Sequence, residues 1–227
     1  PSGVGLLVEK ELTELSRLDN PEKPFVLVLG GSKVADKIGV IENLVTKADH
    51  ILIGGGMAFT FLKAKGINTG KSIIDEESLE FAKTMIEKYP EKIVLPVDVN
   101  AFEEFNNDSN NRFVKVEELT ENEMGLDIGP ETIELFTNIL RDAKTVFWNG
   151  PLGVYEFEKC TTGSKKLLEA LVNFGTTTIL GGGDIVAAAG DLGYKDKVTH
   201  ASTGGGATLE YMEGKELPGL SCIPEND

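Results

Sequence analysis

Short apolar and β-branched runs alternate with longer stretches of helical periodicity along almost the whole chain. The short runs predict buried strands, and the longer stretches predict helices with one apolar face. Strands that alternate with helices form βαβ units, which build a largely parallel sheet covered by helices on both faces. The sequence therefore predicts an α/β fold in three layers, with strands near residues 25–29, 51–53, 93–95, 145–148, 177–180 and 198–201.

An amphipathic stretch precedes the first of these strands. One apolar face is marked, at helical spacing, by Leu7, Val8, Leu12, Leu15 and Leu18. We therefore expect a leading helix within residues 1–20 and one α/β domain over residues 21–227, with the last ten or so residues as a tail. No shift in composition after residue 21 marks a second domain.

The charge balance and the cysteines limit the partners and the compartment. The chain has 22 Lys and Arg against 37 Asp and Glu, a formal charge of −15, which argues against nucleic acid or an anionic membrane as the main partner. No apolar stretch is long enough to span a bilayer. Cys160 and Cys222 make no disulfide framework and are typical of a reducing cytosol. The chain begins at Pro1 without a basic segment or cleavage site, so we expect no signal peptide, a cytoplasmic location, and a processed chain or a piece of a longer one.

Glycines are abundant and clustered. There are 26 in 227 residues, about 11% against an average near 7%. Ligands of open α/β sheets bind at the carboxyl ends of the strands, where glycine lets the backbone approach a ligand and a helix N-terminus suits phosphate. One cluster alone would indicate a tight turn, but four at one sheet edge favour a ligand site: residues 30–31, 54–56, 181–183 and 204–206.

The common nucleotide motifs fail on spacing. Residues 66–72 (GINTGKS) are one residue short of a P-loop and follow a predicted helix, whereas a P-loop follows a strand. The glycine triplets lack the third glycine of the dinucleotide fingerprint, and GxSxG, HExxH and CxxC are absent from the sequence. His50 and His200 have no ligand partners near in sequence, so a structural role is expected for each.

Four charged residues near the glycine clusters are candidates for a phosphate site. Lys33 and Lys37 lie four residues apart at a predicted helix start, on one face, where cations oppose the helix dipole unless an anion binds there. They could equally be solvated surface lysines. Asp184 could hold Mg²⁺ beside phosphates or cap a helix, and the two roles are compatible. Glu156 could accept hydrogen bonds from ribose, although an exposed glutamate is the more common explanation.

Six segments in order along the chain resemble phosphoglycerate kinase, and specifically its C-terminal, nucleotide-binding half. They are residues 29–38 (LGGSKVADKI), 53–62 (IGGGMAFTFL), 125–130 (GLDIGP), 148–158 (WNGPLGVYEFE), 181–184 (GGGD) and 202–207 (STGGGA). The resemblance implies a Rossmann-like domain preceded by an interdomain helix, acting as a monomer. It implies reversible phosphoryl transfer between 1,3-bisphosphoglycerate and ADP in glycolysis, giving 3-phosphoglycerate and ATP with Mg²⁺. The N-terminal half, which binds 3-phosphoglycerate and supplies an arginine, is not in this sequence.

The resemblance also implies a role for individual residues. The adenine slot would be lined by Gly31, Gly55, Gly56, Leu126 and Val154, with a backbone contact from Gly125 and the ribose held by Glu156. Pro151 would be a further nucleotide-binding residue. Phosphate oxygens would meet Lys33, Lys37, Asn149 and the N–H groups of Gly182, Gly183 and Ile185, while Asp184 would hold the metal. The groups closest to the phosphoryl in transfer would be Lys37, Gly183, Gly205 and Gly206.

Two departures from the family pattern qualify this expectation. Ile185 stands where the family usually has Ser or Thr, which removes a hydroxyl and could weaken nucleotide binding by about 1.5–3 kcal/mol. The absent half leaves the acceptor substrate without a site, so the chain alone is expected to bind nucleotide with little or no turnover. A non-catalytic nucleotide-binding or regulatory module is the alternative. A dinucleotide binder is disfavoured by the missing third glycine, and a pure interaction scaffold would not need the two lysines and the aspartate.

Overall fold

A six-stranded parallel sheet forms the centre of the molecule. The computed structural model describes residues 5–216, and Cys222 and most of the expected tail lie outside that range. The strand order is β3 (Ile93–Val94), β2 (His50–Ile53), β1 (Phe25–Leu29), β7 (Thr145–Asn149), β8 (Thr177–Leu180) and β9 (His200–Ala201). Every pairing between these strands is parallel. The predicted α/β class is confirmed, and β9 is shorter than the predicted strand.

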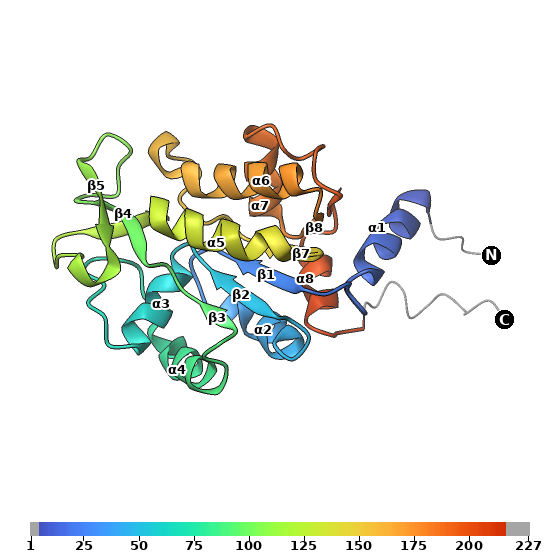
Figure 1. Ribbon diagram of the computed structural model, residues 1–227, viewed down its shortest axis with the longest axis horizontal. Helices are drawn as coiled ribbons and strands as arrows, with labels where there is room; N and C mark the ends of the chain where they lie inside the picture. The colour runs from blue at the N-terminus through green and yellow to red at the C-terminus, as the bar shows by residue number, and fades with distance from the viewer. Residues whose placement is uncertain (1–4, 217–227) are drawn as a thin grey trace.

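Helices cover both faces of this sheet, as Figure 1 shows. Side chains alternate across β1, so that Leu27 packs into one apolar cluster and Val28 into the other. The first cluster includes side chains of α2 (Ile38–Leu44), α3 (Met57–Ala64), α4 (Leu79–Lys88) and α8 (Gly206–Met212). The second includes side chains of α5 (Pro130–Asp142), α6 (Thr162–Phe174) and α7 (Gly183–Asp191). The expected three layers are therefore present.

A second, smaller sheet is antiparallel and does not follow from the strand–helix alternation. Its order is β5 (Asn111–Lys115), β4 (Asp98–Phe102), β6 (Met124–Ile128). All five residues of β4 are buried although Asp98 and Asn100 are polar, whereas β5 buries only Val114. No strand is predicted from the sequence in this region, because the buried strand β4 contains the polar residues Asp98 and Asn100 in place of a continuous apolar run.

The leading helix is present but its apolar face is only half buried. α1 (Leu6–Ser16) packs Leu15 into the first cluster, together with the following Leu18. Leu7 and Val8, predicted on the same face, are 66% and 45% exposed. The helix is fixed to the sheet mainly through its second half.

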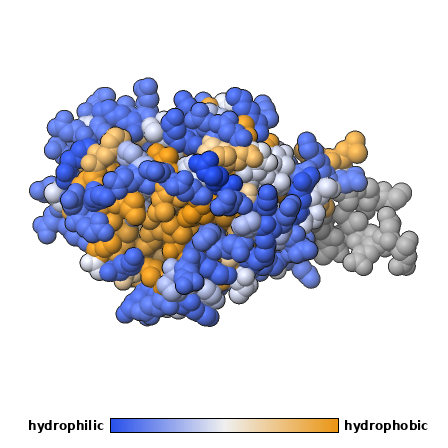
Figure 2. Space-filling model, viewed as in Figure 1, coloured by the Kyte–Doolittle hydropathy of each residue, from blue (hydrophilic) through white to orange (hydrophobic). Residues whose placement is uncertain are grey.

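The edge of the main sheet at β3 is apolar. Figure 2 shows apolar side chains gathered on this face of the molecule, in the area between α5 and α4 in Figure 1. A groove of about 360 Å³ among α3, α4 and β3 is lined mainly by aliphatic side chains and prolines. None of the helices in residues 5–216 has the length and apolar character needed to cross a membrane.

Candidate functional site

The loops at the carboxyl ends of β1, β2 and β7 pack backbone against backbone. A Cβ atom at Gly30 would lie 2.1 Å from the carbonyl oxygen of Pro151. Gly55 has a φ of +63°, and a Cβ there would lie 2.6 Å from the nitrogen of Gly31. Only glycine fits such contacts without movement of the backbone. The glycine clusters thus bring three strand ends together, in addition to leaving space for a ligand.

Two adjacent cavities open at this edge of the sheet. One has a volume of about 570 Å³ and the other about 490 Å³, and both are lined by Gly31, Ser32 and Asp184. Because these three residues belong to both walls, the two cavities meet there. The two cavities are therefore neighbours at this edge of the sheet.

The larger cavity lies between the main sheet and the small antiparallel sheet. The expected nucleotide residues on its wall are Gly31, Gly55, Gly56, Gly125, Leu126, Pro151, Val154, Glu156 and Asp184. The Val154 N–H donates to the carbonyl oxygen of Leu126 at 2.9 Å, which joins the loop after β7 to β6. With Leu126, Val154 and neighbouring apolar groups, this wall offers a slot for a flat apolar group with Glu156 at its rim.

The smaller cavity is lined by two lysines and by side-chain and backbone amide groups. The expected phosphate residues on its wall are Lys33, Lys37, Asn149, Gly182, Gly183, Asp184 and Ile185. The Lys37 ammonium donates to Oδ1 of Asn149, and Nδ2 of Asn149 donates to the carbonyl of Gly181 at 2.5 Å. Burial lowers the pKa of Lys37, while Asp36 and Asp184 raise it. A cation held in a partly desolvated site is a favourable partner for an anion.

The two lysines do not share a helix face, contrary to the expectation from their spacing. Lys37 ends a short 3₁₀ helix (Ala35–Lys37) and is 8% exposed, whereas Lys33 precedes that helix and is exposed. They reach the same cavity because the chain turns between them. A four-residue spacing predicts a shared face only within an α-helix, and α2 starts after both.

Asp184 and Ile185 lie in the first turn of α7. The N-cap of this helix is Gly182, so the interpretation of Asp184 as an N-cap is wrong. Ile185 borders the smaller cavity, but its side chain is fully buried in the second apolar cluster. Within residues 5–216, no group of three or more His, Cys, Asp or Glu residues could hold a metal ion. Any metal here would need ligands from a bound molecule as well as Asp184.

Gly205 and Gly206 are not on the wall of either cavity. They lie at the start of α8, whose Leu209 does line the smaller cavity. The preceding loop is fastened to α1: the Glu11 carboxylate accepts from Nε2 of His200 at 2.8 Å and from the Thr203 N–H at 3.1 Å. His200 has the expected structural role, and the fourth glycine cluster stands beside the site.

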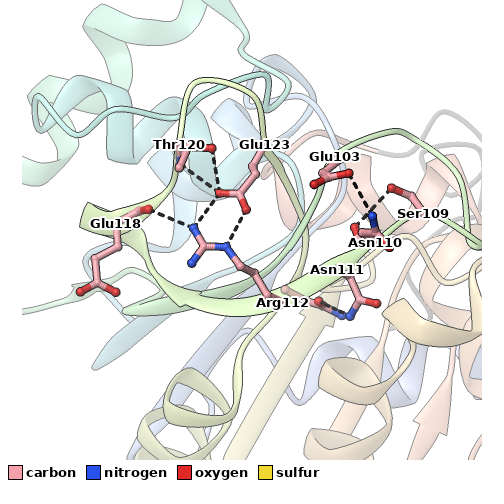
Figure 3. Close-up of polar contacts among 9 residues, drawn as sticks. Glu103, Ser109, Asn110, Asn111, Arg112, Glu118, Thr120 and Glu123 are labelled. Atoms are coloured by element: carbon pink, nitrogen blue, oxygen red, sulfur yellow. Dashed lines mark hydrogen bonds and ion pairs between the residues drawn. The ribbon is translucent and has the colours of Figure 1, made fainter.

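The small sheet is held by an ion pair between the half-exposed Arg112 and the buried Glu123, which Figure 3 shows. Arg112 of β5 donates Nε to Oε1 of Glu123 at 2.6 Å and a second nitrogen to Oε2 at 3.0 Å. Oε2 also accepts from the N–H and hydroxyl of Thr120. The Arg112 bond, assisted by Thr120, lowers the pKa of Glu123 to about 2. Glu123 directly precedes Met124 and Gly125, so the pair fixes the strand that forms the cavity wall.

A second carboxyl of this sheet is buried without a cation. Asp127 accepts from the Gly163 N–H of α6 at 3.0 Å and from the Ile128 N–H at 2.9 Å. Burial raises the pKa of Asp127 to about 8, against the effect of these two N–H groups. A Cβ at Gly153 would lie 2.6 Å from Oδ1 of Asp127. The carboxyl thus sits where β6, α6 and the loop after β7 meet.

Sequence reasoning missed several residues on the wall of the larger cavity. They are Ser32, Lys71, Ile73, Phe105, Met124, Gly153 and Tyr155. Phe105 is 63% exposed and its ring lies 4.9 Å from that of Phe157. Lys71 belongs to the segment that failed the P-loop test, where the cluster of Gly70, Lys71 and Ser72 was the available signal. The position of Lys71 on the cavity wall depends on the antiparallel sheet, which the sequence pattern does not predict.

Known proteins match the chain over most of its length. The family model described as phosphoglycerate kinase matches residues 1–215. The curated phosphoglycerate kinase of Lactobacillus delbrueckii subsp. bulgaricus is 55% identical over 227 residues, which is 99% of this chain and 56% of that protein. The one from Listeria welshimeri is 54% identical over 226 residues, with 99% and 57% covered. The chain spans about half the length of the curated relatives it matches.

Solved structures agree with these sequence matches. The phosphoglycerate kinase structure from Coxiella burnetii superposes with a TM-score of 0.92 at 40% identity, covering 95% of this chain and 57% of that one. The structure from Pyrococcus horikoshii OT3 gives a TM-score of 0.85 at 31% identity, covering 96% and 56%. In sequence and in fold, the chain belongs to the phosphoglycerate kinase family.

Proposed function

We propose that the chain binds Mg-ADP and Mg-ATP across the two joined cavities, as the nucleotide-binding half of a phosphoglycerate kinase. The observation that carries this proposal is the junction of the cavities at Gly31, Ser32 and Asp184. An apolar slot on one side and a lysine-containing cavity on the other match a molecule with a flat base at one end and phosphates at the other. A site for a small anion alone would not require the apolar slot of the larger cavity.

The base and ribose would occupy the larger cavity. Leu126 and Val154 would contact the base, and Gly31, Gly55, Gly56 and Pro151 would leave room for it. The Gly125 backbone would lie beside it. Glu156 is exposed at the rim, where its carboxylate would accept hydrogen bonds from the ribose hydroxyls.

The phosphates would occupy the smaller cavity. Lys33, Lys37 and Asn149 would donate to phosphate oxygens, with backbone N–H groups of Gly182, Gly183 and Ile185. Phosphoryl transfer depends mainly on positioning and charge neutralisation and needs no protein nucleophile. Lys37, already buried and held by Asn149, would follow the transferring group, and the start of α8 at Gly205 and Gly206 would face it from the adjacent loop.

The residues present fit a magnesium ion that arrives with the nucleotide. Mg²⁺ commonly takes one or two carboxylates and completes its shell with waters and phosphate oxygens. Asp184 borders both cavities and is exposed, so its carboxylate would hold such an ion. The bound ion would neutralise phosphate charge.

For the whole protein we propose reversible phosphoryl transfer between 1,3-bisphosphoglycerate and ADP, giving 3-phosphoglycerate and ATP in glycolysis, in the cytoplasm. The part of the relatives that this chain does not match would hold 3-phosphoglycerate, and residues 1–20 would link the two parts. The chain by itself would act as a monomer that binds nucleotide with little or no turnover, because one of its two substrates has no site here.

Isothermal titration calorimetry with Mg-ADP tests this proposal. We expect one binding site per chain, and the Lys37→Met variant should bind ADP about 10-fold more weakly or worse, because a hydrogen bond to a charged group is lost. Lys33→Met, which removes an exposed lysine from the same cavity, should cost less. Absence of ADP binding by the folded chain, or an unchanged affinity in Lys37→Met, would contradict the site. Substantial ATP formation from 1,3-bisphosphoglycerate by the chain alone would contradict the proposal that turnover needs the part of the protein that this chain does not match.

A further inference from the structure

The turn that carries Lys37 begins with a backbone N–H that its own cap residue does not satisfy. Lys37 ends the 3₁₀ helix Ala35–Lys37, and its N–H donates to the carbonyl oxygen of Val34 at 2.9 Å. Val34 is the N-cap of this helix and makes no side-chain hydrogen bond to it. The first N–H groups of a helix have no partner within the helix and need one from elsewhere. The N–H of Ala35 is such a group.

Asp75 supplies this partner from a distant part of the chain. Its Oδ2 accepts a hydrogen bond from the Ala35 N–H at 2.9 Å, across 40 residues of sequence. A carboxylate oxygen is a good acceptor for an unpaired N–H at a helix start, and its charge strengthens the bond. The turn from Ala35 to Lys37 is therefore capped by a residue that lies outside it.

Asp75 is itself held by two further hydrogen bonds. Its N–H donates to Oγ1 of Thr60 at 3.0 Å, and Thr60 is a fully buried residue of α3. The Ser78 hydroxyl donates to Oδ2 of Asp75 at 2.9 Å, the same oxygen that accepts from Ala35. Both the backbone and the carboxylate of Asp75 are thus fixed, which gives the capped turn a defined position relative to α3.

The capped turn, and not Asp75 itself, borders the proposed phosphate site. Ala35 and Lys37 line the smaller cavity, whereas Asp75 lines neither cavity. The Lys37 ammonium donates to Oδ1 of Asn149 at the other end of the turn. A turn that is ordered before a ligand arrives reduces the conformational entropy that binding would otherwise cost. Asp75 can therefore influence phosphate binding without touching a phosphate.

We infer that Asp75 is a positioning residue, which caps the turn from Ala35 to Lys37 and thereby holds Lys37 in place for the phosphates. This inference rests on the proposed nucleotide function and assigns no contact between Asp75 and the nucleotide. Without the carboxylate, the Ala35 N–H loses its partner and the turn has to become ordered when the phosphates bind.

A double-mutant cycle, measured by calorimetric titration with Mg-ADP, tests the inference. In Asp75→Ala the affinity for ADP should fall about 10-fold, because a hydrogen bond to a charged group is lost. In the Lys37→Met background the same change should cost about threefold or less, because the two residues act together. Asp75→Asn keeps an oxygen that can accept from Ala35, so its affinity should stay within about threefold of that of the unmodified chain. Equal losses in both backgrounds, or an unchanged affinity in Asp75→Ala, would overturn the inference.

The matched control is Asp49→Ala. Oδ2 of Asp49 accepts from the Phe25 N–H at 2.7 Å, a contact of the same kind at the amino ends of β1 and β2. Asp49 lines neither cavity. This variant should lower the melting temperature and leave the affinity for ADP unchanged. If Asp49→Ala and Asp75→Ala weaken ADP binding equally, a general loss of stability explains both and the inference is wrong.

Amide hydrogen exchange, followed by NMR in the absence of nucleotide, tests the turn directly. In Asp75→Ala the Ala35 and Lys37 amides should exchange about 10-fold faster than in the unmodified chain, while those of β1 should not change. Unchanged exchange at Ala35 and Lys37 would overturn the capping role. If the unmodified chain binds no ADP, the proposed function fails first, and the role of Asp75 in nucleotide binding fails with it.

Discussion

The two sides of the larger cavity are built on different physical principles. On the side of the parallel sheet, loops after β1, β2 and β7 touch through their backbones, and glycine is required because a Cβ at Gly55 would lie 2.6 Å from Gly31. On the side of the small antiparallel sheet, the wall is positioned by carboxyl groups: Glu123 held by Arg112, and Asp127 held by backbone N–H groups. The wall on the side of the parallel sheet depends on steric fit, whereas the wall on the side of the antiparallel sheet depends also on the protonation state of its carboxyl groups.

This difference determines how each side should respond to change. Backbone contacts have no titratable group and cannot relax by moving a side chain. Carboxyl groups respond to pH, and their surroundings decide the direction: an ion pair favours the charged form, and burial without a cation favours the neutral form. The cavity therefore combines one wall that is sensitive to steric change with one that is sensitive to pH.

The largest expected effect is that of Gly55→Ala. The new Cβ would meet backbone atoms at a φ of +63°, and the expected loss is about 3 kcal/mol or more in the free energy of unfolding, together with nucleotide binding. Gly125→Ala on the other wall would meet the Phe59 ring, with Cζ at 2.0 Å, and should cost about 1–3 kcal/mol because a side chain can shift. Urea unfolding measures both. Equal losses in the free energy of unfolding would mean that both walls accommodate an added Cβ equally well.

Asp127→Asn comes next and tests the buried carboxyl. The folded-state pKa of Asp127 is raised to about 8 from 3.8, so folding favours the protonated form. Stability from this group is full below about pH 4 and is lost as the pH rises to 8. The unmodified chain should therefore lose stability relative to Asp127→Asn between these values, measured by urea unfolding at pH 5, 7 and 9. Parallel curves for the two proteins would contradict the buried, uncompensated carboxyl.

Glu123→Gln should show the opposite pH dependence. The folded-state pKa of Glu123 is lowered to about 2 from 4.5, so its contribution is present above about pH 4.5 and is lost as the pH falls towards 2. The unmodified chain should be more stable than Glu123→Gln at pH 6, and the difference should shrink to a minor part of that value near pH 2.5, as followed by thermal unfolding. A difference that is undiminished at pH 2.5 would indicate packing rather than the Arg112 pair.

The smallest expected effect is that of Phe105→Ala. Phe105 is 63% exposed and meets Phe157 at a ring distance of 4.9 Å, an arrangement worth about 0.5–1.5 kcal/mol. Unfolding stability should fall by about 1 kcal/mol or less, and the affinity for ADP should fall only a few-fold. A loss as large as that of Gly55→Ala would mean that the exposed hairpin supports the cavity more than its contacts indicate.

Much of the fold and part of the site could be predicted because the responsible signals are local. The parallel sheet is buried on both faces, so β1 is a continuous apolar run, and the glycines that follow it are required by contacts within the same edge. The small sheet escaped prediction because β4 is buried through polar partners: Asp98 accepts from Thr132 N–H at 2.7 Å, 34 residues away. Lys33 and Lys37 line one cavity, but not through the helical geometry that their spacing predicts.

By itself the sequence determined the layer order, the clustered glycines and their place at the strand ends, because periodicity and glycine content act over a few residues. Only the tertiary structure decided that Lys37 is buried against Asn149, that Lys71 borders the cavity, and that Glu123 and Asp127 have opposite pKa shifts. Burial and charge pairing depend on neighbours far apart in the chain. The pKa and the hydrogen-bond partners of a lysine or a carboxylate therefore depend on surroundings that only the folded structure defines.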